Sequence, residues 1–190
     1  MRRTSGHAHP RSSATRLGRL PRHAGYTAQA VTEAPTAPKP DGVVVEEITA
    51  VRSDDLAALQ ALIPELSTSA PTLTHTDLAA IVASPATVLF AARRGARIVG
   101  SLTLVVFNAP TGPRAWIEDV VVATTERGGG IGAALVDAAL KRASEAGART
   151  VDLTSRPSRE AANRLYLRLG FEVRQTNVYR RDVDRPGNRD

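Results

Sequence analysis

Cysteine is absent from the 190-residue sequence, and histidine is scarce. Without cysteine the protein can form no disulfide, no thiolate metal site and no cysteine nucleophile. Three of the four histidines lie within the first 40 residues, which leaves only His75 in the rest of the chain. Because metal sites and catalytic triads commonly need clustered histidines, we expect no bound metal and no histidine-based triad.

Long apolar runs are also absent. No stretch approaches the roughly 20 consecutive apolar residues that a membrane-spanning helix needs. No short apolar core follows the N-terminal arginines, as a secretory signal would require. We therefore expect a soluble, cytoplasmic protein without a membrane partner.

Acidic residues are nearly missing from residues 1–40, which hold seven of the 25 Lys and Arg residues but one of the 19 Asp and Glu residues. The rest of the chain carries 18 of each sign, so it shows no excess positive charge that would indicate a nucleic-acid partner. The basic segment lacks apolar periodicity and is rich in Arg, Ser, Pro and Ala. We expect residues 1–40 and 186–190 to be disordered, with an organelle transit peptide as the alternative for the first segment.

The sequence as a whole is 42% apolar, enough for one globular domain, which we place at residues 41–185. Strands are predicted at residues 43–51, 87–92, 97–107 and 115–123, helices at about 53–66 and 74–84, and a loop at 108–114. Ser53 and Thr76 are the predicted N-caps of these helices, and Pro64 is expected to end or kink the first helix.

The pattern then changes to strand, helix, strand. The second and third segments are residues 130–145 and 149–154, and Gly147 stands where a C-cap glycine belongs. Two strands joined by a helix of this length should be parallel, with a right-handed crossover. A further helix is predicted to run from a Ser158 cap to Gly170, and residues 171–183 should supply the last one or two strands of a mixed α/β sheet.

A glycine cluster lies between the strand and the helix of this unit. It consists of Gly128, Gly129, Gly130 and Gly132, and Arg127 precedes it. A helix start leaves backbone N–H groups unpaired and carries about half a positive charge, and glycines allow phosphate oxygens to approach these donors. The cluster therefore predicts a binding site for a pyrophosphate.

Other interpretations of the cluster compete with this one. A P-loop is excluded, because the motif ends in Gly-Ala-Ala and lacks the required lysine. A dinucleotide-binding fingerprint is formally matched by Gly128, Gly130 and Ala133, with Asp152 near the end of the next strand, but too little chain follows for such a sheet. A turn that only lets the helix pack closely would explain one or two glycines.

Two segments resemble motifs of one family, the GNAT superfamily of acetyl-CoA-dependent N-acetyltransferases. The stretch VVVATTERGGGIGAALV is similar to the acyl-CoA motif of that family at Arg127, Gly130 and Gly132. The stretch AANRLYLRLGFE is similar to a later family motif at Asn163, Leu165, Tyr166, Gly170 and Phe171. The resemblance implies an α/β (α+β) fold with a mixed, largely antiparallel sheet, one splayed pair of parallel strands and about four helices.

The resemblance also implies acetyl-CoA as co-substrate, with its pantetheine arm in the gap between the splayed strands. The implied cofactor-binding residues are Val120, Val121, Val122, Arg127, Gly128, Gly129, Gly130, Ile131, Gly132 and Asn163. The hydroxyl of Tyr166 would lie near the thioester sulfur.

Acetyl transfer to an amine needs a neutral amine, a polarised carbonyl and a proton for the departing thiolate. Tyr166 is chemically suited to supply that proton, although it also fits an ordinary core position. Glu118 is the candidate base because it shares strand parity with Val120 and Val122, whereas the side chain of Asp119 should point to the other face. A water relay, or a merely solvated Glu118, is the alternative. Without cysteine, direct attack in a ternary complex is expected.

The acceptor is not identified by the sequence. A small amine, an amino acid, an amino sugar or a protein N-terminus all fit, and we expect a monomer or homodimer. Arg156, Arg159 and Arg174 either bind an acidic acceptor or are surface charge. A non-catalytic acyl-CoA-binding regulatory module is the alternative function.

Overall fold

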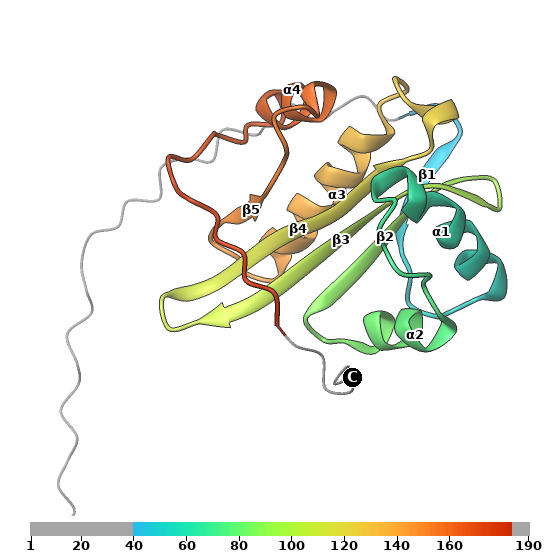
Figure 1. The fold of residues 1–190 in the computed structure, drawn as a ribbon, viewed down its shortest axis with the longest axis horizontal. Coiled ribbons are helices and arrows are strands. Elements are labelled where there is room, and N and C mark those ends of the chain that lie inside the picture. The colour runs from blue at the N-terminus through green and yellow to red at the C-terminus, as the bar shows by residue number, and fades with distance from the viewer. Residues whose placement is uncertain (1–39, 184–190) are drawn as a thin grey trace, which may run out of the picture. The chain divides into compact units, whose positions relative to one another are not determined.

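A five-stranded sheet in the order β1-β2-β3-β4-β5 forms the centre of the fold (Figure 1). The strands are β1 (Val43–Glu47), β2 (Thr87–Arg94), β3 (Arg97–Ala109), β4 (Gly112–Val122) and β5 (Val151–Leu153). The first four strands pair antiparallel, and β4 and β5 pair parallel. The predicted mixed sheet with one parallel pair is therefore confirmed.

The computed structural model describes residues 40–183. The predicted disordered segments, 1–40 and 186–190, lie outside the described residues except for residue 40. Among residues 40–183, no helix combines the length and the apolar character needed to cross a bilayer. The same residues contain no group of three or more His, Asp or Glu side chains that could hold a metal ion.

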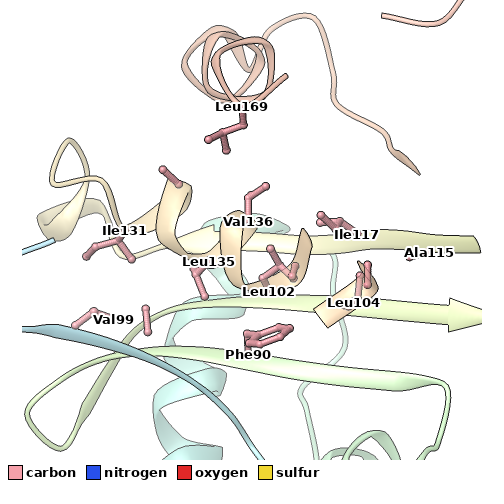
Figure 2. Packing of buried hydrophobic residues seen from close by; sticks show 14 residues of the cluster. Phe90, Val99, Leu102, Leu104, Ala115, Ile117, Ile131, Leu135, Val136 and Leu169 are labelled. Carbon is pink, nitrogen blue, oxygen red and sulfur yellow. The ribbon is translucent and has the colours of Figure 1, made fainter. Parts of the chain in front are cut away.

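Helices cover both faces of the sheet. They are α1 (Ser53–Leu66), α2 (His75–Ala83), α3 (Ile131–Glu145) and α4 (Glu160–Arg168), together with the 3-10 turn η1 (Thr124–Glu126). On one face, here called the α3 face, α3 packs against side chains such as Phe90, Leu102 and Ile117, and Leu169 at the end of α4 packs on α3 (Figure 2). On the other, the α1 face, α1 and α2 cover Leu89 and Val121.

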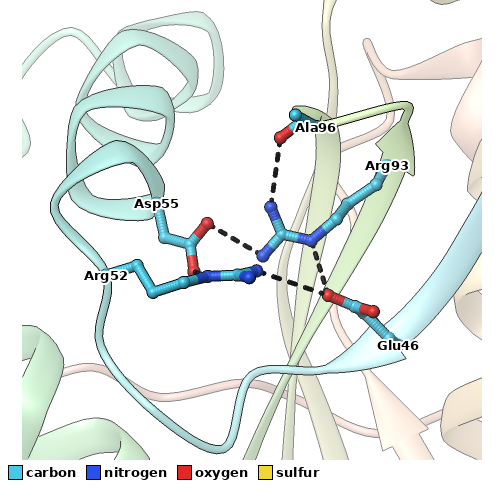
Figure 3. A network of polar contacts seen from close by, with 5 residues as sticks. All are labelled: Glu46, Arg52, Asp55, Arg93 and Ala96. Carbon is cyan, nitrogen blue, oxygen red and sulfur yellow. Dashed lines mark hydrogen bonds and ion pairs between the residues drawn. The ribbon is translucent and has the colours of Figure 1, made fainter.

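An ionic network with a buried pair at its centre fixes the start of α1 to the sheet (Figure 3). Arg93 Nη2 lies 2.8 Å from Oδ1 of Asp55, and the two side chains are only 10% and 3% exposed. Arg93 also pairs with Glu46 on β1, and Arg52 pairs with the second oxygen of Asp55. Because this network holds one end of α1, it also limits where the other end of the helix can lie.

Helix boundaries follow the predictions with small corrections. Thr74, rather than Thr76, caps α2, because its hydroxyl and the Asp77 carboxylate form a reciprocal capping box. Arg159, rather than Ser158, precedes α4. The predicted role of Gly147 is confirmed, since its φ is 76° and the amides of Gly147 and Ala148 bond back to carbonyls in the last turn of α3.

Two predictions about the edges of the sheet are wrong. The loop expected at residues 108–114 is mostly strand, because β3 and β4 stay paired up to Ala109 and Gly112 and leave a two-residue turn. Residues 171–183 form no strand. Their apolar side chains, such as Val173 and Tyr179, are 86% and 87% exposed, so they have no packed surface that would fix a strand register.

Candidate functional site

A bulge interrupts β4 near its end. The register between β3 and β4 shifts between Ser101 and Thr103. Across this shift two residues of β4, Asp119 and Val120, oppose a single residue of β3, and Asp119 has a positive φ of 53°. A bulge of this kind bends the strand and changes which face its side chains point to.

The bulge corrects the prediction about Glu118. Ile117 and Val120 both pack in the α3-face cluster, although they are three residues apart. Glu118 is paired with Thr103 of β3, and its side chain lies on the opposite, α1 face of the sheet. Strict alternation along the strand would place the side chains of Glu118 and Val120 on the same face. The prediction that they share a face is therefore wrong. Its role as base stays a prediction that now rests on its position beside the bulge.

The bulge coincides with a splay between β4 and β5. The two strands pair only over residues 115–117 and 151–153, whereas β4 continues to Val122. A cavity of about 750 Å³ borders this unpaired end of β4, together with the start of α3, most of α4 and the last residues of α1. The predicted residues that line it are Val120, Val121, Val122, Arg127, Gly128, Gly130, Ile131, Gly132 and Tyr166. Gly129, Glu118 and Asn163 do not line it.

The start of α3 has the features of an anion site. Gly130 is its N-cap, with a φ of 81°, and no side chain caps the helix. The first N–H groups of α3 therefore have no partner within the helix. Gly128 has a φ of 86°, and a Cβ built on it would meet no atom within 4 Å. The start of α3 therefore offers unpaired backbone N–H donors next to open space, an arrangement suited to binding a phosphate group.

Gly132 has a different reason to be glycine. A Cβ at this position would lie 3.2 Å from Cδ2 of Leu165 and 3.9 Å from Cγ2 of Val122. The missing side chain lets α3 approach α4 and β4 closely. For this one glycine, the close-packing interpretation applies.

Arg127 is held by two partners at the cavity wall. Its Nε donates to the Val122 carbonyl at 3.1 Å, and its Nη2 donates to Oε2 of Glu65 at 3.3 Å. The same carboxylate oxygen accepts hydrogen bonds from the amide and the hydroxyl of Thr124, at 2.8 and 2.7 Å. Hydrogen bonding to the Thr124 hydroxyl is the main cause that lowers the pKa of Glu65. No sequence pattern indicated a role for Glu65, which lies 62 residues before Arg127.

The side chain of Tyr166 borders the cavity, and its phenol hydroxyl has a raised pKa. Burial raises the pKa of its hydroxyl, and the nearby charge of Arg159 offsets part of that effect. Its ring meets Phe171 edge-on, with centroids 5.8 Å apart. The phenol is therefore neutral at physiological pH and can donate a proton or a hydrogen bond into the cavity.

The side chains of Asn163 and of two of the three arginines considered for an acceptor, Arg159 and Arg174, have structural partners. The Asn163 amide donates to the Arg156 carbonyl at 3.0 Å, which stabilises the segment before α4. Arg159 donates to the Leu66 carbonyl at 2.9 Å, and Arg174 lies 3.4 Å from Asp152. The side chains of Asn163 and Arg159 therefore tie the start of α4 to neighbouring backbone.

A family model and several solved structures resemble this chain. The sequence model described as the acetyltransferase (GNAT) family matches residues 55–171. A candidate acetyltransferase from Agrobacterium tumefaciens strain C58 is 29% identical, with a TM-score of 0.65, and the match covers 73% of this chain and 99% of that one. A protein from Bacillus halodurans C-125 described as a transcriptional regulator is 27% identical, with a TM-score of 0.64 over 74% of this chain and 99% of that one.

A more distant structure shares the fold. An aminoglycoside N-acetyltransferase, AAC(6')-Iy, in complex with CoA is 17% identical, with a TM-score of 0.63, and the match covers 74% of this chain and 94% of that one. A comparison with curated proteins finds no match.

Proposed function

This chain belongs to the GNAT acetyltransferase family, and from that premise we propose that it transfers the acetyl group of acetyl-CoA to a primary amine. One observation carries the proposal. The unpaired end of β4, the uncapped start of α3 and the neutral phenol of Tyr166 all border the same cavity. The CoA complex of the distant aminoglycoside acetyltransferase supports the same cofactor.

Residues of the cavity suit the diphosphate, the pantetheine arm and the thioester of coenzyme A. The open space at Gly128 and the first N–H groups of α3 suit the diphosphate, with Arg127 as the charged partner. Residues 120–122 present a strand edge that β5 leaves unpaired, and an extended pantetheine arm can hydrogen-bond to such an edge. Backbone N–H groups of that edge would polarise the thioester carbonyl.

Proton transfer is assigned to two side chains. Tyr166 donates a proton, or a hydrogen bond, to the departing thiolate, because its raised pKa keeps the phenol protonated. Glu118 accepts the amine proton beside the bulge. Because Glu118 lies on the α1 face, the amine approaches from that face and attacks the thioester directly in a ternary complex.

The acceptor is a small amine, an amino acid, an amino sugar or a protein N-terminus. Some structural neighbours are aminoglycoside acetyltransferases, which supports amino sugars as one of the candidate acceptors. Binding of acetyl-CoA should first raise the thermal stability of the full chain. Release of free thiol is then measured over a panel of amines. Cofactor binding without release for any amine would contradict the proposed transfer.

Non-catalytic acyl-CoA sensing is the second candidate, because the relative from Bacillus halodurans is described as a transcriptional regulator. Sensing needs the cavity but neither proton-transfer group. Full acetyl-CoA binding with no turnover in the amine panel would favour it. The neutral phenol that lines the cavity favours the enzyme.

A further inference from the structure

The last turn of α1 places a carboxylate in the wall of the cofactor cavity. Oε2 of Glu65 accepts hydrogen bonds from the Thr124 amide at 2.8 Å and from the Thr124 hydroxyl at 2.7 Å. It also accepts one from Nη2 of Arg127 at 3.3 Å. Three donors therefore converge on one oxygen of a side chain that borders the cavity.

These donors are of the kinds that bind a phosphate oxygen. Backbone N–H, hydroxyl and guanidinium groups are the common phosphate donors in proteins. The hydrogen bonds from Thr124 lower the pKa of Glu65, so the carboxylate carries its charge at neutral pH. Glu65 therefore acts on Thr124 and Arg127 as an internal anion.

The position of Arg127 makes this contact matter for cofactor binding. Arg127 directly precedes the turn at Gly128 and Gly130 that leads into the uncapped start of α3, and all three residues line the cavity. A diphosphate bound at that turn would gain a charged hydrogen-bond donor from Arg127. The Glu65 carboxylate already compensates part of that charge and adds a negative charge to the same wall.

We propose that Glu65 competes with the diphosphate of coenzyme A for the guanidinium of Arg127, and so sets the cofactor affinity below what the cavity could reach. The inference rests on the proposed function, because it takes coenzyme A as the ligand. The competition also links the cofactor to α1. Diphosphate binding draws Arg127 away from Glu65, while Thr124 still holds the Glu65 carboxylate and Arg159 still holds the adjacent Leu66 carbonyl.

Glu160 provides a matched control. It also lines the cavity, and it pairs with a different arginine, Arg164, at 3.3 Å. Glu65→Gln and Glu160→Gln therefore each remove one negative charge from the same cavity. Only the first frees the arginine next to the glycine turn.

The test is calorimetric titration of coenzyme A into the wild-type chain and both variants, with inorganic diphosphate as a competing ligand. Glu65→Gln should bind coenzyme A and diphosphate more tightly by roughly two- to fivefold, the range of an exposed ion pair. Glu160→Gln frees Arg164, which also lines the cavity but belongs to α4 rather than to the glycine turn, so its gain in affinity should be smaller than that of Glu65→Gln. The gain should shrink in high salt, because exposed charges are screened. Thermal melts check that both variants are folded.

Three results would overturn the inference. Equal affinity in wild type and Glu65→Gln would show that the contact has no effect on binding. Weaker binding in Glu65→Gln would show that Glu65 instead positions Arg127 for the cofactor. An equal gain in Glu160→Gln would reduce the effect to general charge. If no variant and no wild-type sample binds coenzyme A, the proposed function itself fails, which is a distinguishable outcome.

Discussion

The indole Nε1 of Trp116 donates a 2.7 Å hydrogen bond to Oε1 of Glu118, two residues further along β4. Both residues precede the bulge, and alternation places them on the same face of the strand. The hydrogen bond fixes the orientation of the carboxylate next to the point where β4 separates from β5. A carboxylate held in this way is suited to receive a proton from an incoming amine.

Glu118→Gln should lower kcat by at least about 100-fold, because general-base catalysis typically contributes 10²–10⁴. Trp116→Phe should lower kcat by less, since it keeps the Glu118 carboxylate but removes the hydrogen bond that orients it. Asp119→Asn is the control, because asparagine tolerates the positive φ of the bulge. Thiol-release kinetics measure all three. If Glu118→Gln retains wild-type kcat, a water relay is the base.

Tyr166→Phe should lower kcat about 100-fold or more while leaving the Kd for coenzyme A unchanged, because only the proton donor is removed. Steady-state kinetics and calorimetry separate the two quantities. Wild-type turnover in Tyr166→Phe would make the residue an ordinary core side chain that packs on Phe171.

The stability of the protein at high pH should also depend on Tyr166. Burial raises the pKa of its hydroxyl, so above about pH 10 the unfolded chain loses this proton more readily than the folded protein does. The free energy of unfolding should therefore fall as pH rises through that range. Tyr166→Phe should lack this part of the decline. Denaturant unfolding at pH 9 to about 11 measures the difference, and parallel curves for the two proteins would contradict it.

Gly132→Val should lower the free energy of unfolding by about 1–3 kcal/mol, the usual cost of overpacking. Its side chain would press on Leu165, whose Cδ2 lies 3.2 Å from an ideal Cβ. Coenzyme A binding should weaken as α4 is displaced. Adding Leu165→Ala should restore part of both losses, in a double-mutant cycle. Strictly additive losses would rule out this contact as the cause.

Asp55→Asn should lower the free energy of unfolding by about 3 kcal/mol, because it leaves the buried Arg93 with Glu46 as its main partner. The exposed pair of Glu160 and Arg164 serves as the control, and Glu160→Gln should change stability by less than about 1 kcal/mol. Urea unfolding measures both. Similar small changes would mean that the network does not hold α1 in place.

Local chemistry made much of the fold predictable from the sequence. The strand–helix–strand unit, its parallel pairing and the C-cap of α3 follow from periodicity and from Gly147. The position of the cavity was also predictable from the glycine cluster, because a strand followed by glycines and a helix leaves backbone N–H donors exposed.

The remaining features depend on contacts that periodicity does not encode. The bulge at Asp119 changes the face of Glu118 by inserting one residue, and a strand pattern read with strict alternation misses it. Glu65 reaches Arg127 because α1 packs on β3 and β4 and its last residues border the cavity. The 171–183 segment carries strand-forming residues but finds no pairing partner among the described residues.

Calorimetric titration of acetyl-CoA into the 190-residue chain decides whether the cavity binds coenzyme A. We expect one binding site per chain for acetyl-CoA, a loss of that binding when Gly130 is replaced by valine, and no heat with a nicotinamide dinucleotide. Clear heat with the nicotinamide dinucleotide and none with acetyl-CoA would contradict this expectation.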